Sequence, residues 1–383
     1  LQGRLARNAL DALQTGAALV LLVGAGLLVR SFWTLSNVDL GFDTKNIFTF
    51  QVAPSGPSFN NAPAFARFHE GVMERLRGLP GVESVGYVNE LPLDEGASPE
   101  RFATEQSLGA GATLPPIMST FTAGDYFPTM KIPLLNGRLF QQSDHSGGAT
   151  NVIVSRAAAE FLWPNENPIG KRLLYGADPS DGTWTTVVGV VDDVRLDSFR
   201  QEAKDPLIYL PSVGPTPMAW GVGSPAYVVR TSRADTIAAD VRTLLQEIAP
   251  GAPMYRIFTL EGLAGRSLAP TSFTMLLLAI AAGLAMVLGA VGVYGVLSYV
   301  VSQRKQEIAL RMALGAGAPS VRRMVVAQGS RVTLFGVALG LVAALGLTSL
   351  LDSLLFGVEP LDVPTFAAMS LLMTWLSQVD EVP

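Results

Sequence analysis

One stretch of the chain carries no charged side chain for 29 residues, from Phe273 to Val301. About 20 apolar residues in a helix are enough to cross the hydrocarbon core of a bilayer. A run this long can span a membrane with tilt or protrude beyond it. The sequence therefore predicts a membrane-spanning helix over about 272–301.

Three further apolar runs predict three more spans in the 383-residue chain. Residues 16–29 are uncharged up to Arg30, and apolar flanks extend them to a first span within residues 1–36, behind a short cytoplasmic flank. This run alone is also compatible with a buried core helix, because it is shorter than a bilayer is thick. Later runs predict spans over about 328–351 and 361–377. We interpret the last as truncated, because a polar segment ends it.

Glycines recur within the second and third predicted spans. In lipid, helices associate through close packing, and small residues let their backbones approach. The three long runs have no charge in their central apolar parts, which argues against an ion or proton path. If this protein moves something, the energy must come from a partner. The predicted packing positions are Gly283, Gly289, Gly292, Gly295, Gly336 and Gly340.

Basic residues set the predicted orientation. Residues 302–331 hold six Lys and Arg residues against the single acid Glu307, and Arg4 and Arg7 precede the first span. By the positive-inside rule both flanks are cytoplasmic, which places residues 37–270 outside. That region carries 25 acids and 18 bases, which suits a translocated domain.

The region between the first two spans shows the same pattern near both of its ends. A strand, an amphipathic helix and a second strand follow one another each time, judged by the spacing of apolar residues. Two such units that flank an insertion predict a split ferredoxin-like layer, one sheet with helices on one face. The predicted strands and helices cover 46–53, 62–79, 82–88, 226–231, 235–248 and 254–260.

The insertion, about 98–211, is richer in Gly, Pro and strand-like runs such as 185–191, with a short helix over 155–162. It reads as a mostly β subdomain. The predicted fold is thus a membrane α-helical bundle of four spans, the last one truncated, with an inserted α+β extracytoplasmic domain.

No residue pattern predicts a catalytic, cofactor or metal site. The segment 168–172 has a Gly-Lys pair but lacks the earlier glycine and the Ser or Thr of a phosphate-binding loop. Asp192 and Asp193 follow an apolar strand, where adjacent acids commonly form a solvated turn. The chain has no cysteine, and its two histidines, His69 and His145, are far apart in sequence.

The cytoplasmic loop 302–323 is the candidate contact with a partner. Residues 303–316 predict a short amphipathic helix that is stopped by glycine. Such a helix between two spans can transmit motion, or it can rest on anionic headgroups, and the residues alone leave both readings open. The candidate residues are Arg304, Lys305, Glu307, Ile308, Arg311, Met312, Leu314, Gly315 and Ala316.

At this loop the sequence resembles a known family. The pattern Arg-x-x-Glu-Ile-x-x-Arg-x-Ala-Leu-Gly-Ala, residues 304–316, is similar to the loop between the second and third spans of FtsX-like permeases of the MacB type. The order of one span, a large extracytoplasmic domain and three spans also matches. Segments 37–43 and 79–85 resemble the start of the MacB-like periplasmic core domain. Further matching segments are 125–127, 135–138, 161–163, 354–358 and 362–366.

The resemblance implies three parts: residues 1–36, a MacB-like periplasmic core domain over 37–268, and an FtsX-like permease domain over 269–383. It implies a multi-pass subunit of an ABC transporter in the bacterial inner membrane, which transmits motion from a separate ATPase. A second permease module, a periplasmic client and the lipid bilayer are the other expected partners, without nucleic acid. The closest group carries two such modules in one chain, of which this would be the second.

One departure from the family is the end at 377–383, where a basic tail is expected. The alternative is a membrane-anchored scaffold that binds an envelope protein without transport. A membrane-tethered enzyme rests only on acids such as Asp192 and Asp193.

Overall fold

The computed structural model describes residues 2–54, 62–94, 97–111, 113–145, 151–176, 182–196, 205–212, 224–267, 334–346, 358 and 361–379, with scattered helical positions between 273 and 291. Contacts divide the chain into two compact units. One comprises Leu1–Val38 with Ala269–Pro383, and the other comprises Asp39–Leu268.

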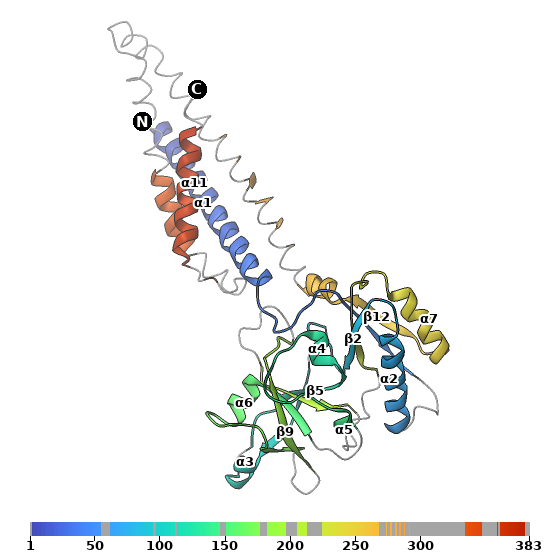
Figure 1. The fold of residues 1–383 in the computed structure, drawn as a ribbon. Coiled ribbons are helices and arrows are strands. Elements are labelled where there is room, and N and C mark those ends of the chain that lie inside the picture. The colour runs from blue at the N-terminus through green and yellow to red at the C-terminus, as the bar shows by residue number, and fades with distance from the viewer. Residues whose placement is uncertain are drawn as a thin grey trace, which may run out of the picture. The chain divides into compact units, whose positions relative to one another are not determined.

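The two ends of the second unit form one layer of four strands and two helices (Figure 1). Neighbouring strands run antiparallel in the order β12-β1-β11-β2. This is the split ferredoxin-like arrangement that the sequence predicts. The elements are β1 Ile47–Val52, α2 Ala62–Arg77, β2 Val82–Val88, β11 Ala226–Thr231, α7 Ala238–Ile248 and β12 Met254–Thr259.

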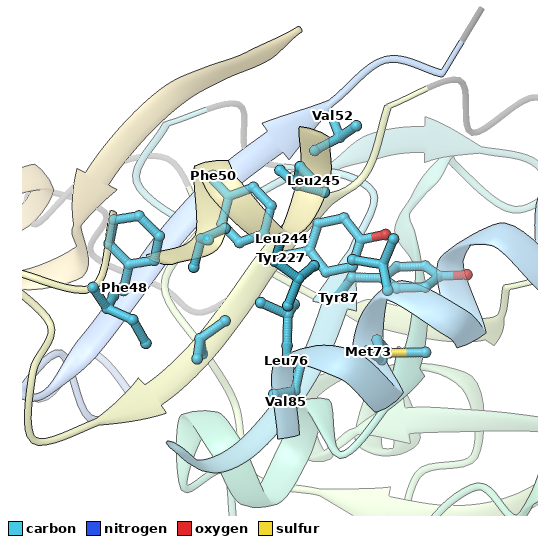
Figure 2. Packing of buried hydrophobic residues seen from close by; sticks show 14 of the residues in the cluster. Phe48, Phe50, Val52, Met73, Leu76, Val85, Tyr87, Tyr227, Leu244 and Leu245 are labelled. Atoms are coloured by element: carbon cyan, nitrogen blue, oxygen red, sulfur yellow. The ribbon is translucent and has the colours of Figure 1, made fainter. Parts of the chain in front are cut away.

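The layer is held by an apolar core between the sheet and its two helices (Figure 2). Alternate residues of β1, Phe48 and Phe50, face this core, and Val72 and Leu76 face it from one side of α2. Full burial of a side chain such as Leu76 contributes roughly 1.5–3 kcal/mol. The apolar spacing visible in the sequence is therefore the spacing that the core uses.

The insertion between β2 and β11 continues the same sheet. Across the described residues the strand order runs on from β2 through β5, β10, β7, β9 and β8 to β4, while β3 pairs with β5 and β6 with β9. The β5–β10 and β7–β9 pairs are parallel, so the sheet is mixed. The strands are β3 Ser98–Glu100, β4 Phe102–Thr104, β5 Ile117–Gly124, β6 Leu134–Gly137, β7 Asn151–Ser155, β8 Arg172–Tyr175, β9 Thr183–Val191 and β10 Leu207–Pro211. The helices are α3 Glu105–Gly109, α4 Tyr126–Met130, α5 Gln142–His145 and α6 Arg156–Leu162.

The expectation of helices on one face only is wrong. Helix α4 lies against β2 and β11, on the face opposite α2 and α7. Gly86 makes this approach possible, because a Cβ at this position would lie 2.4 Å from the backbone nitrogen of Tyr126. Gly124, with φ +63°, turns the chain from β5 into α4. Both faces of the layer are therefore covered.

The first unit contains α1 Gln2–Ser36, a helical segment Leu334–Gly346 and α11 Val363–Val379. Among the described residues, only Gly16–Ser36 forms a helix long and apolar enough to cross a membrane, with a mean hydropathy of 1.9. Most of the predicted span 272–301 falls outside the description, and residues 334–346 are the described part of the predicted span 328–351. The helices of this unit share an apolar cluster that includes Leu19, Val23, Val337 and Phe366.

Candidate functional site

Both connections from the domain to the predicted spans leave from one end of the sheet. Strands β1 and β12 are antiparallel neighbours, with Phe48 opposite Thr259 and Val52 opposite Met254. The first residues of β1, which follow α1 in the chain, therefore lie beside the last residues of β12. Residues 260–267 continue from β12 as a helix toward the apolar run 273–301.

Residues 39–45, which we call the strap, join α1 to β1 and are fixed by backbone contacts. The N–H of Asp43 donates to the carbonyl of Met130 at 2.9 Å, and the N–H of Arg195 donates to the carbonyl of Leu40 at 2.9 Å. Gly41 has φ +80°, and a Cβ there would lie 1.9 Å from the carbonyl oxygen of Asp193. Glycine is required at this position because of both the conformation and the close approach.

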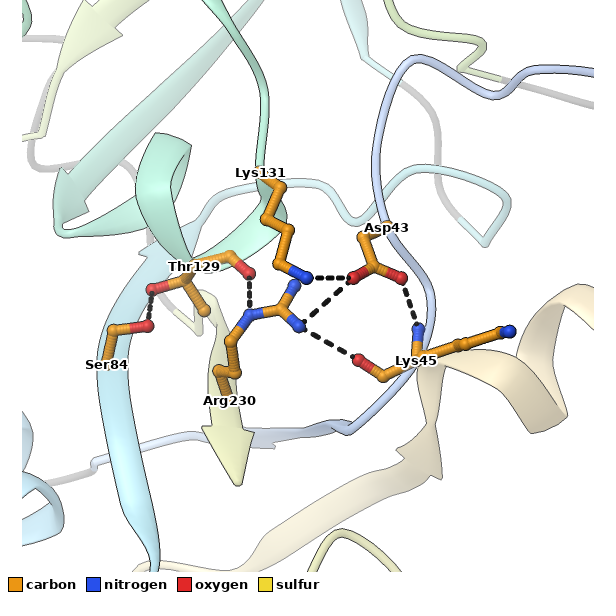
Figure 3. A network of polar contacts seen from close by, with 6 residues as sticks. All are labelled: Asp43, Lys45, Ser84, Thr129, Lys131 and Arg230. Atoms are coloured by element: carbon orange, nitrogen blue, oxygen red, sulfur yellow. Dashed lines mark hydrogen bonds and ion pairs between the residues drawn. The ribbon is translucent and has the colours of Figure 1, made fainter. Parts of the chain in front are cut away.

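A charged network fastens the carboxyl-terminal part of the strap (Figure 3). Arg230, 6% exposed, donates from Nε to the carbonyl of Thr129 at 2.8 Å. Its Nη1 donates to the carbonyl of Lys45 at 3.1 Å and to Asp43 Oδ2 at 3.2 Å. Lys131 Nζ reaches the same Asp43 oxygen at 2.8 Å. One carboxylate thus joins β11 and the residue after α4 to the strap.

The same network keeps Asp43 ionised. Burial alone would raise the pKa of Asp43, but the hydrogen bonds from Lys131 and from the Lys45 N–H, with the charges of Arg230 and Lys131, hold it below its usual value. The ionised carboxylate compensates the buried guanidinium, which would be costly to leave unpaired.

The other connection is fastened by a second ion pair. Arg256 of β12, at φ +49°, lies where the pairing with β1 shifts register. Its Nη2 lies 2.8 Å from Oδ2 of Asp94, in the loop after β2. The neighbouring Leu93 N–H donates to the carbonyl of Leu196 at 2.7 Å, which joins the loop after β2 to the segment after β9.

Two of the glycines predicted to pack lie in a close helix contact. A Cβ on Gly340 would lie 2.8 Å from the carbonyl oxygen of Gly16, and one on Gly16 would lie 3.2 Å from that of Gly336. A Cβ on Gly283 would meet no described atom within 4 Å. Gly289, Gly292 and Gly295 lie outside the described residues.

The sequence reading missed the partners of these glycines in α1. Gly16 faces the segment Leu334–Gly346, and a Cβ on Gly26 would lie 2.9 Å from Thr365 of α11. Arg30 of α1 also pairs with Asp362, which precedes α11. The small residues inside the first apolar run are the feature of the sequence that could have predicted these contacts.

The candidate coupling residues all lie outside the description, so their role stays a prediction. They are Arg304, Lys305, Glu307, Ile308, Arg311, Met312, Leu314, Gly315 and Ala316.

The weaker chemical candidates have structural partners. Lys171 pairs with Glu166 beside the turn at Gly170. Asp192 Oδ1 lies 3.0 Å from Arg156, and Asp193 Oδ1 accepts from the Ala157 N–H at the start of α6. The described part of the chain contains no group of three or more acidic or histidine side chains that could hold a metal ion.

The two histidines are held neutral in the second unit. His69 is fully buried among Phe65, Phe68 and Tyr87, and its Nδ1 is hydrogen-bonded to the Tyr227 hydroxyl. Burial lowers the pKa of His69 to about 3. Burial also lowers the pKa of His145, whose Nδ1 lies 3.2 Å from the carbonyl oxygen of Ser212.

The family follows from a match over most of the chain. A family model of the MacB-like periplasmic core domain matches residues 17–253. The chain belongs to this family. A second model, the FtsX-like permease C-terminal region, matches residues 279–378. Together the two matches identify an FtsX/MacB-type permease.

Named relatives are export proteins. The macrolide export ATP-binding/permease protein MacB of Agrobacterium fabrum is 27% identical over 288 residues, which cover 73% of this chain and 42% of that protein. The pyoverdine export ATP-binding/permease protein PvdT of Pseudomonas entomophila is 25% identical, covering 57% of this chain and 34% of that protein. The chain spans less than half the length of both relatives.

Two solved structures are similar to the domain. The periplasmic region of MacB from Actinobacillus actinomycetemcomitans has 16% identity and a TM-score of 0.40, covering 61% of this chain and 97% of that one. The extracellular domain of the transporter YknZ from Gram-positive bacteria has 19% identity and a TM-score of 0.33, covering 53% of this chain and 94% of that one.

Proposed function

We propose that this chain is a permease module of an ABC transporter that transmits ATP-driven motion to an extracytoplasmic domain. Residues 1–36 and 269–383 form four spans of a bacterial inner-membrane protein, and residues 37–268 lie outside. The family match supports the permease assignment, and the basic loop 302–331 supports the orientation.

The observation that carries the proposal is the pairing of β1 with β12. Because the two connections leave from adjacent strand ends, a change in the separation of the first two spans acts on a single edge of the domain. Each connection is also fastened by an ion pair, Asp43–Arg230 on one side and Asp94–Arg256 on the other. Movement of the first span therefore reaches folded structure within residues 39–45, and movement of the second reaches it at the helix 260–267 and β12.

Energy enters from a separate ATPase that binds the loop 302–323, and the second span carries the motion outward. The long apolar runs lack charges in their centres, which argues against an ion or proton path as the energy source. Exposed apolar side chains at Phe273, Leu277, Ile280, Leu284 and Val291 suit a helix face that contacts lipid or a second permease module. We also propose that the extracytoplasmic domain acts on a periplasmic client.

The test is reversal of charge in the loop. The full protein is purified in nanodiscs with the ABC ATPase that co-purifies with it, and Glu307→Arg and Arg311→Glu are compared with Arg7→Glu, a reversal on the other cytoplasmic flank. Both loop variants should lose ATPase binding and stimulated ATP hydrolysis, while Arg7→Glu retains them. Unchanged binding and hydrolysis in both loop variants would contradict the proposal and favour the membrane-anchored scaffold.

A further inference from the structure

We propose that the strap fastens the first span to the inserted subdomain, with Asp43 as the positioning residue, so that the insertion moves with α1. This inference rests on the proposed function and adds a route through the first span to the route through the second.

The backbone contacts of the strap point mainly to the insertion. Met130, Asp193 and Arg195 all belong to it. Met130 and Arg195 are hydrogen-bonded to Asp43 and Leu40, and the backbone of Asp193 closely approaches Gly41. The Nε of Arg195 also donates to the carbonyl of Asp39 at 3.3 Å. The chain that leaves α1 is thus fixed to the insertion at successive residues before it enters β1.

The side-chain contacts make Asp43 the point at which this fastening joins the ferredoxin-like layer. Lys131 follows α4 in the insertion, and Arg230 belongs to β11, yet both reach Asp43 Oδ2, at 2.8 Å and 3.2 Å. Thr129, which accepts from Arg230, also donates from Oγ1 to Ser84 of β2 at 2.9 Å. Loss of the Asp43 charge removes the one group that both cations share (Figure 3).

A displacement at one end of a chain segment is passed first to the contacts nearest that end. If the strap holds, displacement of α1 reaches Met130 and Arg195 before it reaches β1, and the insertion turns relative to α2 and α7. If the strap is released, residues 39–45 extend and the displacement reaches the edge strand β1 alone.

The experiment uses the cysteine-free chain, in which introduced cysteines are the only labelling sites. Spin labels at Glu160→Cys of α6 and Gln246→Cys of α7, both exposed, report the distance between insertion and layer by double electron-electron resonance. The full protein is measured in nanodiscs with its ATPase, in ADP and after trapping with ATP and vanadate. Asp43→Asn and Lys131→Ala are compared with Glu166→Gln, which breaks an ion pair with Lys171 inside the insertion.

The parent and Glu166→Gln should show the same nucleotide-dependent shift in distance. Asp43→Asn should lose most of that shift and Lys131→Ala part of it, with ATPase binding retained. Without any ATPase, amide exchange at Asp43 should be about tenfold faster in Asp43→Asn, as expected from loss of a charge-assisted hydrogen bond. Asp43→Glu should restore part of the shift.

A full shift in Asp43→Asn, or unchanged exchange in the strap, would overturn this inference and leave the proposed function standing. No shift in the parent, despite active hydrolysis, would refute the proposed function and the inference with it.

Discussion

Acidification should destabilise the extracytoplasmic domain through His69. The side chain is buried with its pKa lowered from 6.5 to about 3, so the folded domain holds it neutral while the unfolded chain protonates it below pH 6.5. The unfolded state therefore binds more protons between these two values, and stability is lost as pH falls through that window. The contribution is fully present above pH 6.5.

The size of the loss at pH 5 can be worked out from the two pKa values. At this pH the unfolded histidine gains a free energy of RT ln(1 + 10^1.5), which is about 2 kcal/mol, and the folded one gains almost nothing. A folded pKa one unit higher would change this result little, because it would still lie below pH 5. Carboxyl groups titrate mainly at lower pH, so the step from pH 8 to pH 5 reports on the histidines.

The assay is urea unfolding of the full chain in detergent, followed by tryptophan fluorescence, to which Trp163 and Trp184 of the insertion contribute. The parent should lose about 2 kcal/mol from His69 between pH 8 and pH 5, and His69→Gln should lack this loss. His145→Gln is the matched control, because these are the only two histidines in the chain. It should retain the His69 component. An equal pH dependence in the parent and His69→Gln would refute the reasoning.

Three further predictions concern packing and charge, each read by unfolding of the full chain. Gly41→Ala should destabilise the domain by about 1–2 kcal/mol because of its positive φ, and by about 1–3 kcal/mol more because of overlap with Asp193. Gly170→Ala, also at positive φ but in open space, should show only the cost of the positive φ. Equal costs in the two variants would contradict the close approach. Gly340→Val should lower the thermal midpoint of the membrane unit at a cost of about 1–3 kcal/mol. Gly346→Val should not, because a Cβ at that position would meet no described atom within 4 Å. A neutral Gly340→Val would argue against the contact with Gly16. Asp144→Asn should destabilise by about 2–3 kcal/mol at pH 7, because Asp144 is buried and lies 2.6 Å from the partly exposed Arg138. Burial would raise the pKa of Asp144, but its hydrogen bonds lower it to about 2. The stability that the ionised carboxylate contributes should therefore be lost in the parent, and not in the variant, as pH falls from about 4 toward 2.

The ferredoxin-like layer could be predicted from the sequence because its core uses local periodicity. Alternation in β1 and the spacing of Phe68, Val72 and Leu76 in α2 are visible without knowing what they contact. The continuation of the sheet into the insertion was not visible. It depends on the pairing of β2 with β5, in which Gly86 lies opposite Gly124, a contact between distant positions that leaves no periodic trace.

The sequence indicates only one of the two partners in the ion pair that fastens the strap. Arg230 is a charge within the otherwise apolar strand Ala226–Thr231, which signals that a buried partner is needed. That partner is Asp43, which lies 187 residues earlier in the chain, and only the fold identifies it. Gly41 gave no signal of its own, because many loops contain glycine.

The most direct test of the account is hydrogen exchange of the full protein in nanodiscs with its ATPase, compared between ADP and ATP with vanadate. The account predicts that exchange changes in the strap and at the end of β12, outside the membrane, and that Arg311→Glu abolishes the change. Identical exchange in both nucleotide states, while the ATPase is bound and active, would contradict the claim that this permease transmits motion across the membrane.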